Sequence, residues 1–223
     1  MTMLTRNEQI SRLAIIALCA ALGGCASADP IAYSGIQSSS QLAHNTQDNA
    51  RHIPYRYATQ VEWRNYDSVI LDPVEVYRGT DNQFGDMSAE DRDSLARYMQ
   101  GKFARKLKSR FALVGDVTQR TLRVHLTLTG ASTTTPVLGT LSRLDIAGGL
   151  YNSVQAVRGG EGTFTGSVIY AVEIYDAPTN RLLSAYVTKQ YPGSLNIMAS
   201  FGSLSAAETG IDKGADALVA ELQ

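Results

Sequence analysis

Few residues in this sequence are of a type and spacing that could perform chemistry. It contains three histidines, of which His44 and His52 fall in a polar stretch predicted to precede the folded domain, so His125 is the one expected inside it. A single histidine supplies neither a Ser-His-acid triad nor, without further ligands, a zinc site. Asp72 and Glu75 come closest to a carboxylate pair, and the sequence shows no partner for them. We therefore predict no catalytic, cofactor-binding or metal-ligating residue, and we interpret these side chains as structural.

The glycine-rich stretch RGGEGTFTG, residues 158–166, invites comparison with a phosphate-binding loop. Such loops leave a strand, open onto a helix N-terminus and end in Gly-Lys-Ser or Gly-Lys-Thr. This stretch instead precedes a predicted strand and lacks that ending. We interpret it as a loop without a phosphate site.

A run of basic residues marks the C-terminal part of the first predicted helix, and two interpretations of it stay open. Cations at this end complement the helix dipole and can simply form a solvated face. They can also bind an anionic envelope partner such as lipopolysaccharide, phospholipid headgroups or an acidic protein, with Arg105 and Lys106 as the candidate contacts. The basic residues are Arg97, Lys102, Arg105, Lys106, Lys108 and Arg110.

The most informative single residue is Cys25, which directly follows two glycines at the end of a short apolar run. After a basic start, residues 13–22 form an apolar segment of about ten residues, which is too short for a bilayer span of ~20 residues and typical of a secretory signal peptide. Residues 22–25, Leu-Gly-Gly-Cys, resemble the lipobox of bacterial lipoproteins, whose cysteine is lipidated and becomes the first mature residue. We therefore predict a palmitate-bearing lipid anchor on Cys25. The alternative is an ordinary signal peptide cleaved near residues 26–28.

The cysteine count and the charge narrow the function classes further. The chain has two cysteines, and Cys19 lies inside the predicted signal peptide, so the mature protein keeps one thiol. An internal disulfide and a cysteine-rich zinc site are therefore excluded. Residues 1–24 hold two arginines and one glutamate, so their removal takes the formal charge from −1 to −2. This balance indicates no nucleic acid binding.

The sequence divides into three regions. Residues 1–24 are the predicted lipoprotein signal peptide, residues 25–58 a lipidated tether, and residues 59–223 a single domain, for which the length is sufficient. The tether is rich in Ser, Gln, Asn and Ala and shows no sustained periodicity, so we expect a flexible coil with a typical reach of about 30 Å. Two pieces of it, 33–42 and 52–57, keep enough Tyr and Ile to dock on the domain.

The sequence of the first half of the domain predicts a strand, a helix and a second strand, in that order. Residues 63–77 are β-rich, and Pro73 marks an edge or a bulge because proline cannot donate to a ladder. A capping-box pattern at 88–91 begins a helix over 89–110, and apolar residues recur along one face of it. Residues 121–129, TLRVHLTLT, alternate strictly between apolar and polar side chains. We expect a strand with one buried face and one face free of helices.

The second half predicts a hairpin and a terminal helix. Residues 164–176 and 181–191 flank Ala-Pro-Thr-Asn, a turn sequence. A second capping-box pattern begins a helix at Ser205. The predicted order is β-α-β-(insert)-β-β-α. This order indicates an α+β fold in which two helices pack on one face of a mainly antiparallel sheet.

Several motifs together resemble a known family. They are "YDSVILDPVEVY", "RTLRVHLTLTGAS", "GTFTGSVIYAVEIYDAPTNRLLSAYVTKQYPG" and the terminal helix. In combination with the lipobox they are similar to a proteobacterial lipoprotein family of unknown function, the domain of unknown function thirty-three-thirteen. The resemblance covers about residues 60–223 and implies no activity, cofactor or catalytic residue. The element order is also similar to that of small envelope domains, which is an analogy at the level of fold alone.

The insert between the second and third predicted strands, roughly residues 136–166, is a candidate partner surface. The other elements suffice for a closed core, and unstructured loops of this length are usually functional or disordered. Leu141, Leu144, Leu150 and Val154 can form an apolar face that contacts a membrane or a partner protein. The alternative is a third helix that covers a bare patch of sheet.

These observations lead to a functional hypothesis. We expect a lipid-anchored periplasmic accessory protein on the outer membrane, because the residues after Cys25 are Ala26 and Ser27 rather than aspartate. It is predicted to bind another envelope component, either a protein or a glycolipid, and to be no enzyme and to use no cofactor. A cell-envelope hydrolase and a purely structural lipoprotein are the alternatives.

Overall fold

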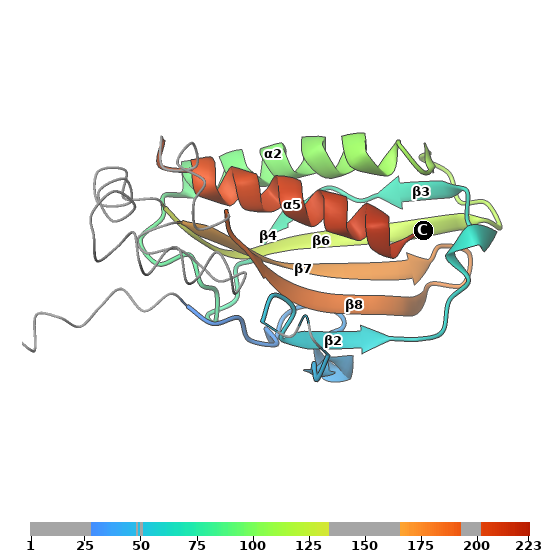
Figure 1. Cartoon of the computed structure of the whole chain (residues 1–223), viewed down its shortest axis with the longest axis horizontal. Helices are drawn as coiled ribbons and strands as arrows, with labels where there is room; N and C mark the ends of the chain where they lie inside the picture. The colour runs from blue at the N-terminus through green and yellow to red at the C-terminus, as the bar shows by residue number, and fades with distance from the viewer. Residues whose placement is uncertain (1–27, 48, 50, 134–165, 193–201) are drawn as a thin grey trace, which may run out of the picture.

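A computed structural model of the protein describes residues 28–47, 49, 51–133, 166–192 and 202–223 (Figure 1). Cys25 and nearly all of the predicted insert, including Leu141, Leu144, Leu150 and Val154, lie outside these residues. The described elements are η1 (Ser39–Gln41), β1 (Ala43–His44), β2 (Tyr55–Ala58), η2 (Trp63–Asn65), β3 (Ser68–Leu71), β4 (Glu75–Val76), α2 (Ala89–Leu107), β5 (Ala112–Leu113), β6 (Thr121–Ser132), β7 (Ser167–Asp176), β8 (Arg181–Gln190) and α5 (Ser205–Glu221).

The strands of the described residues form one mixed sheet of eight strands in the order β1-β2-β8-β7-β6-β3-β5, with β4 paired to β6. The pairs from β1 to β6 along this order are antiparallel, whereas β3 and β4 run parallel to β6. The three long central strands β6, β7 and β8 therefore carry most of the ladder. The predicted α+β class, with a mainly antiparallel sheet and two helices, is confirmed.

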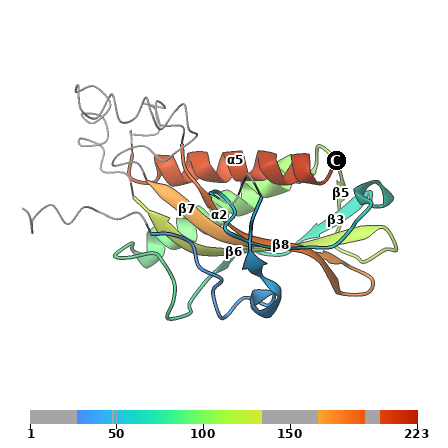
Figure 2. The same cartoon turned by 60° about the horizontal axis from the view of Figure 1, so that its bottom comes forward.

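Helices α2 and α5 lie side by side on one face of the sheet (Figures 1 and 2). Their apolar stripes follow the predicted spacing, and the side chains of these stripes are almost completely buried against the sheet. On α2 the stripe is Leu95, Met99, Phe103 and Leu107, and on α5 it is Ile211, Ala215, Leu218 and the following Leu222. Burial of this interface provides most of the apolar core.

Two ion pairs join the helices where α2 is basic. Lys102 Nζ lies 2.9 Å from Asp212 Oδ1, and Lys106 pairs with Asp216. The candidate partner contact Lys106 is thus engaged within the protein, while Arg105 is exposed on α2. Among the described helices, none has the length and hydropathy needed to cross a bilayer.

The predicted element boundaries differ from the structure in three places. The strand expected at 63–77 is broken at Pro73 into β3 and β4, because proline offers no N–H to the β6 ladder. Ser88 caps α2 as predicted by accepting a hydrogen bond from Asp91 N (3.1 Å), but the helix ends at Leu107. The second predicted capping box is wrong, since Ser205 is already inside α5 and its N-cap residue Leu204 makes no side-chain cap.

The segment predicted as a flexible tether is largely packed on the domain. Residues 55–58 form β2, which pairs with β8, and residues 29–42, named the N-terminal strap here, cross the face of the sheet opposite the helices (Figure 2). Tyr33 and Ile36 of the strap are buried against Ile169 and Val187 of the sheet. The burial of these apolar side chains offsets the entropy that a free tether would retain. From residue 28 on, the described part of the expected tether thus belongs to the folded structure.

Candidate ligand-binding cavity

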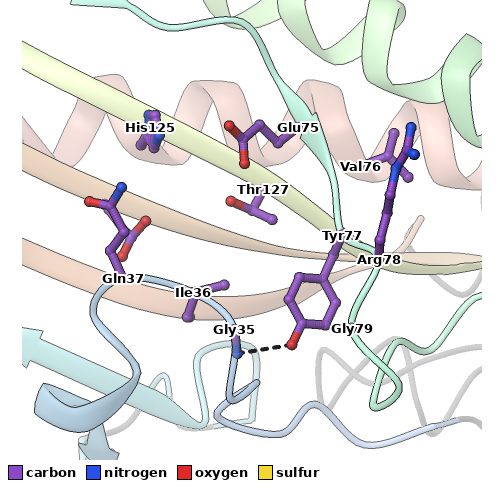
Figure 3. Close-up of a pocket in the computed structure, with 11 residues that line it drawn as sticks. Gly35, Ile36, Gln37, Glu75, Val76, Tyr77, Arg78, Gly79, His125 and Thr127 are labelled. Carbon is purple, nitrogen blue, oxygen red and sulfur yellow. Dashed lines mark hydrogen bonds between the residues drawn. The ribbon is translucent and has the colours of Figure 1, made fainter.

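A polar cavity of about 600 Å³ opens on the helix-free face of the sheet. One wall is the strap at Gly35, Ile36 and Gln37, the other is the segment 75–79, and β6 lies between them (Figure 3). A second hollow of about 380 Å³ adjoins it and shares Gln37, Glu75 and His125. Together they form one continuous polar depression across β6 and β7.

The alternation of β6 explains which side chains reach this cavity. Leu122, Val124 and the following apolar residues face the helices, so Arg123, His125 and Thr127 face the opposite side. The antiparallel register with β7 then places Glu173 directly opposite His125. The sequence pattern therefore predicts the polar face of β6, and the register supplies the carboxylate beside it.

Asp72 joins two of these side chains. Its carboxylate accepts hydrogen bonds from Arg123 Nε (2.9 Å to Oδ2) and from His125 Nδ1 (2.9 Å to Oδ2), and the side chain is only 12 % exposed. Asp72 faces this side because it is one residue beyond β3, on the opposite side from Val69 and Leu71. The prediction that Asp72 has no partner is therefore corrected by a contact across 53 residues of sequence.

Glu173 is the most buried charged side chain of the cavity, with 1 % of its surface exposed. Its Oε1 accepts a hydrogen bond from Ser38 N of the strap at 2.6 Å. Within the part of the chain that the structure describes, no Lys, Arg or His nitrogen lies within 4.0 Å of its carboxylate. Burial, and then the neighbouring Glu173 carboxylate, raise the pKa of Tyr175. The cavity thus contains a carboxylate that has no cationic partner among the described residues.

Tyr77 fastens the strap over the cavity. Its hydroxyl accepts a hydrogen bond from Gly35 N (2.9 Å) (Figure 3). It also donates one to Asp81 Oδ1 (2.7 Å), and Asp81 Oδ2 accepts from Ser34 N (2.9 Å). The Ser34 N–H is the main reason that the pKa of Asp81 lies below its ordinary value. A Cβ at position 35 would lie 2.7 Å from the Tyr77 hydroxyl, so any larger residue would displace the Tyr77 ring. The strap wall is therefore built for close contact with segment 75–79.

Tyr175 and Gln37 close the depression from the β7 side. The Tyr175 hydroxyl donates to Gln37 Oε1 at 3.1 Å. Gln37 is exposed at the rim, as is Glu75 across the cavity. The rim therefore offers polar groups to an entering ligand.

The predicted site residues are distributed unevenly over the structure. Asp72, Glu75 and His125, which were interpreted as separate structural residues, line the same depression. Glu173, the residue that sequence reasoning missed, carries one detectable signal: it is the single acid within the run VIYAVEIY, residues 168–175, which is otherwise apolar or aromatic. Among the described residues, no group of three His, Cys, Asp or Glu side chains is arranged to hold a metal ion.

Comparisons with known proteins identify a family and a set of remote structural neighbours. The family model described as "Protein of unknown function (DUF3313)" matches residues 32–218. No curated protein matches the chain.

The structural neighbours are remote in both sequence and geometry. A single-residue variant of the PelC dodecamer from Paraburkholderia phytofirmans is 10 % identical, with a TM-score of 0.39, over 73 % of this chain and 93 % of that chain. The PelC dodecamer from the same organism in another crystal form is 12 % identical, with a TM-score of 0.36, over 72 % and 91 %. Protein XCC0632 from Xanthomonas campestris, of the family DUF330, is 10 % identical, with a TM-score of 0.36, over 73 % and 91 %.

Proposed function

The chain belongs to the DUF3313 family of proteins of unknown function, and on that premise we propose that it is a lipid-anchored accessory protein that binds another component of the bacterial envelope in the cavity beneath the strap. In this proposal Cys25 carries the lipid and the protein sits on the periplasmic face of the outer membrane. It acts by binding, without catalysis.

The burial of Glu173 without an ion pair is the observation that carries the binding proposal. A buried carboxylate costs folding free energy unless a positive group compensates it. Among the described residues that line the cavity, the basic side chains are His125 and Arg123, both bonded to Asp72, and the exposed Arg78. A ligand with a protonated amine and hydroxyl groups would pair with Glu173 and use the rim groups of Gln37 and Glu75.

Crosslinking in cells tests this proposal. A photoreactive amino acid at the exposed rim position Gln37 or Glu75 should form an adduct with the bound component, because both side chains border the cavity. The matched control is Asp93, an exposed position on α2 on the other side of the sheet. Adducts are detected on gels and by the intact mass of the purified protein, so that both macromolecular and small ligands are visible.

The distribution of adducts decides the outcome. Adducts at Gln37 and Glu75 but not at Asp93 are expected. Equal adducts at all three positions, or adducts at Asp93 alone, would contradict a binding site in the cavity.

An envelope hydrolase is the second candidate, and the Asp72–His125 pair is what favours it. A carboxylate on Nδ1 orients an imidazole so that Nε2 can act as a general base. Among the described residues, however, no Ser or Thr hydroxyl forms a hydrogen bond with the His125 ring. The base would therefore lack an activated nucleophile from this part of the chain.

The substitution His125→Ala separates the two candidates. On the binding proposal it removes one hydrogen bond of Asp72, which keeps Arg123 as its partner, so unfolding should become easier by only about 0.5–1.5 kcal/mol. Any phenotype of a deletion strain should still be restored by the variant. A folded His125→Ala protein that fails to restore the phenotype would instead support the hydrolase.

A further inference from the structure

The strap fixes the start of the described chain to one end of the sheet. Ala28 O accepts a hydrogen bond from Lys189 Nζ at 3.0 Å, and Asp29 O accepts one from Gln83 Nε2 at 2.8 Å. The strap then remains bound to the sheet through the burial of Tyr33 and Ile36. Detachment of the strap would expose both apolar side chains to water and would break its hydrogen bonds to Asp81 at the same time.

These first contacts lie at the end of the sheet opposite the β7–β8 hairpin. Lys189 is next to the last residue of β8 and pairs with Ile169 near the start of β7. The hairpin turn directly precedes Arg181, the first residue of β8, and so lies at the other end of the strand. Arg181 and Lys189 are eight residues apart along β8, or roughly 26 Å at ~3.3 Å per residue. The start of the strap and the hairpin turn lie at opposite ends of the sheet (Figure 1).

The spacing between Cys25 and Ala28 limits how far this end can be from a lipid on Cys25. Three residue steps span at most about 11 Å, even when fully extended. A free tether reaching to residue 58 would instead have a typical reach of about 30 Å. Because the chain is packed on the sheet from Ala28 on, the connection between Cys25 and the folded structure spans at most about 11 Å, instead of the typical reach of about 30 Å expected from the sequence.

We infer that the end of the sheet that carries Gln83 and Lys189 faces the lipid bilayer, with Ala28 held within about 11 Å of the lipidated cysteine. The hairpin turn then points away from the membrane into the periplasm. This inference rests on the proposed lipidation of Cys25, and its partner surface is the bilayer itself. The cavity lies further along the sheet, because Ala185, which pairs with Glu173, is four residues or ~13 Å before Lys189.

Fluorescence quenching in vesicles tests the orientation on the full lipidated protein. Thr133 directly follows β6 at the membrane-facing end, and Val117 is an exposed residue shortly before the start of β6. Thr133→Cys and Val117→Cys each introduce one free thiol for a fluorophore, because Cys25 is lipidated and Cys19 is removed. The eleven residue steps of β6 separate the two ends by about 36 Å. With a quencher on the lipid headgroups, the label at 133 should be quenched roughly twofold or more strongly than the label at 117.

Two controls distinguish the possible failures. The Cys25→Ala variant should no longer float with vesicles, and a wild-type protein that fails to float would overturn the proposed anchor itself. Insertion of ten Gly and Ser residues after Ser27 lengthens the connection to a typical reach of about 20 Å and should reduce the difference between the labels. Equal quenching of both labels in floating wild-type protein, or an unchanged difference after the insertion, would overturn the inferred orientation.

Discussion

The substitution Gly214→Ala is expected to destabilise the protein severely, because α5 approaches the sheet through this glycine. A Cβ at position 214 would lie 1.6 Å from the hydroxyl oxygen and 2.8 Å from Cζ of Tyr170. The Tyr170 ring is 1 % exposed and is held edge-on against Phe103 of α2, with ring centroids 5.8 Å apart. A hollow of about 180 Å³ borders both Tyr170 and Gly214, but the clash is relieved only if this buried ring or the helix shifts. We expect the free energy of unfolding to fall by about 1–3 kcal/mol or more, as for other overpacked cores.

Gly101→Ala is the matched control for this prediction. Gly101 is also inside a helix, but no atom lies within 4 Å of its added Cβ. Alanine should therefore stabilise α2 by about 0.5–1 kcal/mol through its higher helix propensity. Urea unfolding of the detergent-solubilised full-length variants measures both changes. If Gly214→Ala and Gly101→Ala changed the free energy of unfolding in the same direction, α5 would not approach Tyr170 as closely as described.

The elements with strong local periodicity could be predicted from the sequence. The spacing of Leu95, Met99 and Phe103 requires one buried helix face, and alternation along β6 requires one buried sheet face. The β7–β8 hairpin follows from two apolar runs around a turn sequence, and Asn180 adopts the positive φ of 54° that such turns favour. In each case the signal lies within about 20 residues and depends little on the rest of the chain.

The cavity could not be predicted in this way, because its contacts join distant segments. Asp72 meets His125 across 53 residues, and Ser38 meets Glu173 across 135. The strap has a polar composition typical of a tether, yet two buried side chains hold it on the sheet. In β2 the alternation of Tyr55 and Tyr57 is a strand signal, but it is only four residues long. The local sequence pattern thus predicts the polar face of β6, but it does not show that the strap lies over this face.

The strap connects the proposed anchor and the proposed binding site. It begins four residues after Cys25 and forms one wall of the cavity, where Ser38 N contacts the Glu173 carboxylate. A ligand that enters the cavity therefore lies between the strap and segment 75–79. Binding should strengthen the attachment of the strap, because a ligand bridging the two walls stabilises the closed arrangement.

Replacing Glu173 with glutamine should stabilise the fold and weaken ligand binding at the same time. The glutamine side chain has nearly the same shape, and its Oε1 can still accept the hydrogen bond from Ser38 N. It removes a buried negative charge that, among the described residues, has no cation within 4.0 Å. We expect the free energy of unfolding to rise by roughly 1–3 kcal/mol in the absence of ligand.

Loss of the same charge should remove the partner of a positively charged ligand group. A hydrogen bond to a charged group contributes about 1.5–3 kcal/mol, so the yield of adducts at the Gln37 and Glu75 rim positions should fall about tenfold or more. The control for charge alone is Asp93→Asn with the photoreactive residue at Gln37, because Asp93 is exposed on α2, on the other side of the sheet from the cavity. That variant should leave the unfolding free energy unchanged within about 0.5 kcal/mol.

The combination of the two readouts is what identifies Glu173 as a binding residue. If a carboxylate serves only the fold, neutralising it lowers the stability of the protein. If it is retained for a ligand, neutralising it raises the stability and reduces ligand binding. A Glu173→Gln protein that unfolds more easily would therefore assign this carboxylate to the strap contact with Ser38. A more stable variant with undiminished adducts would instead show that the ligand of this cavity carries no positive charge.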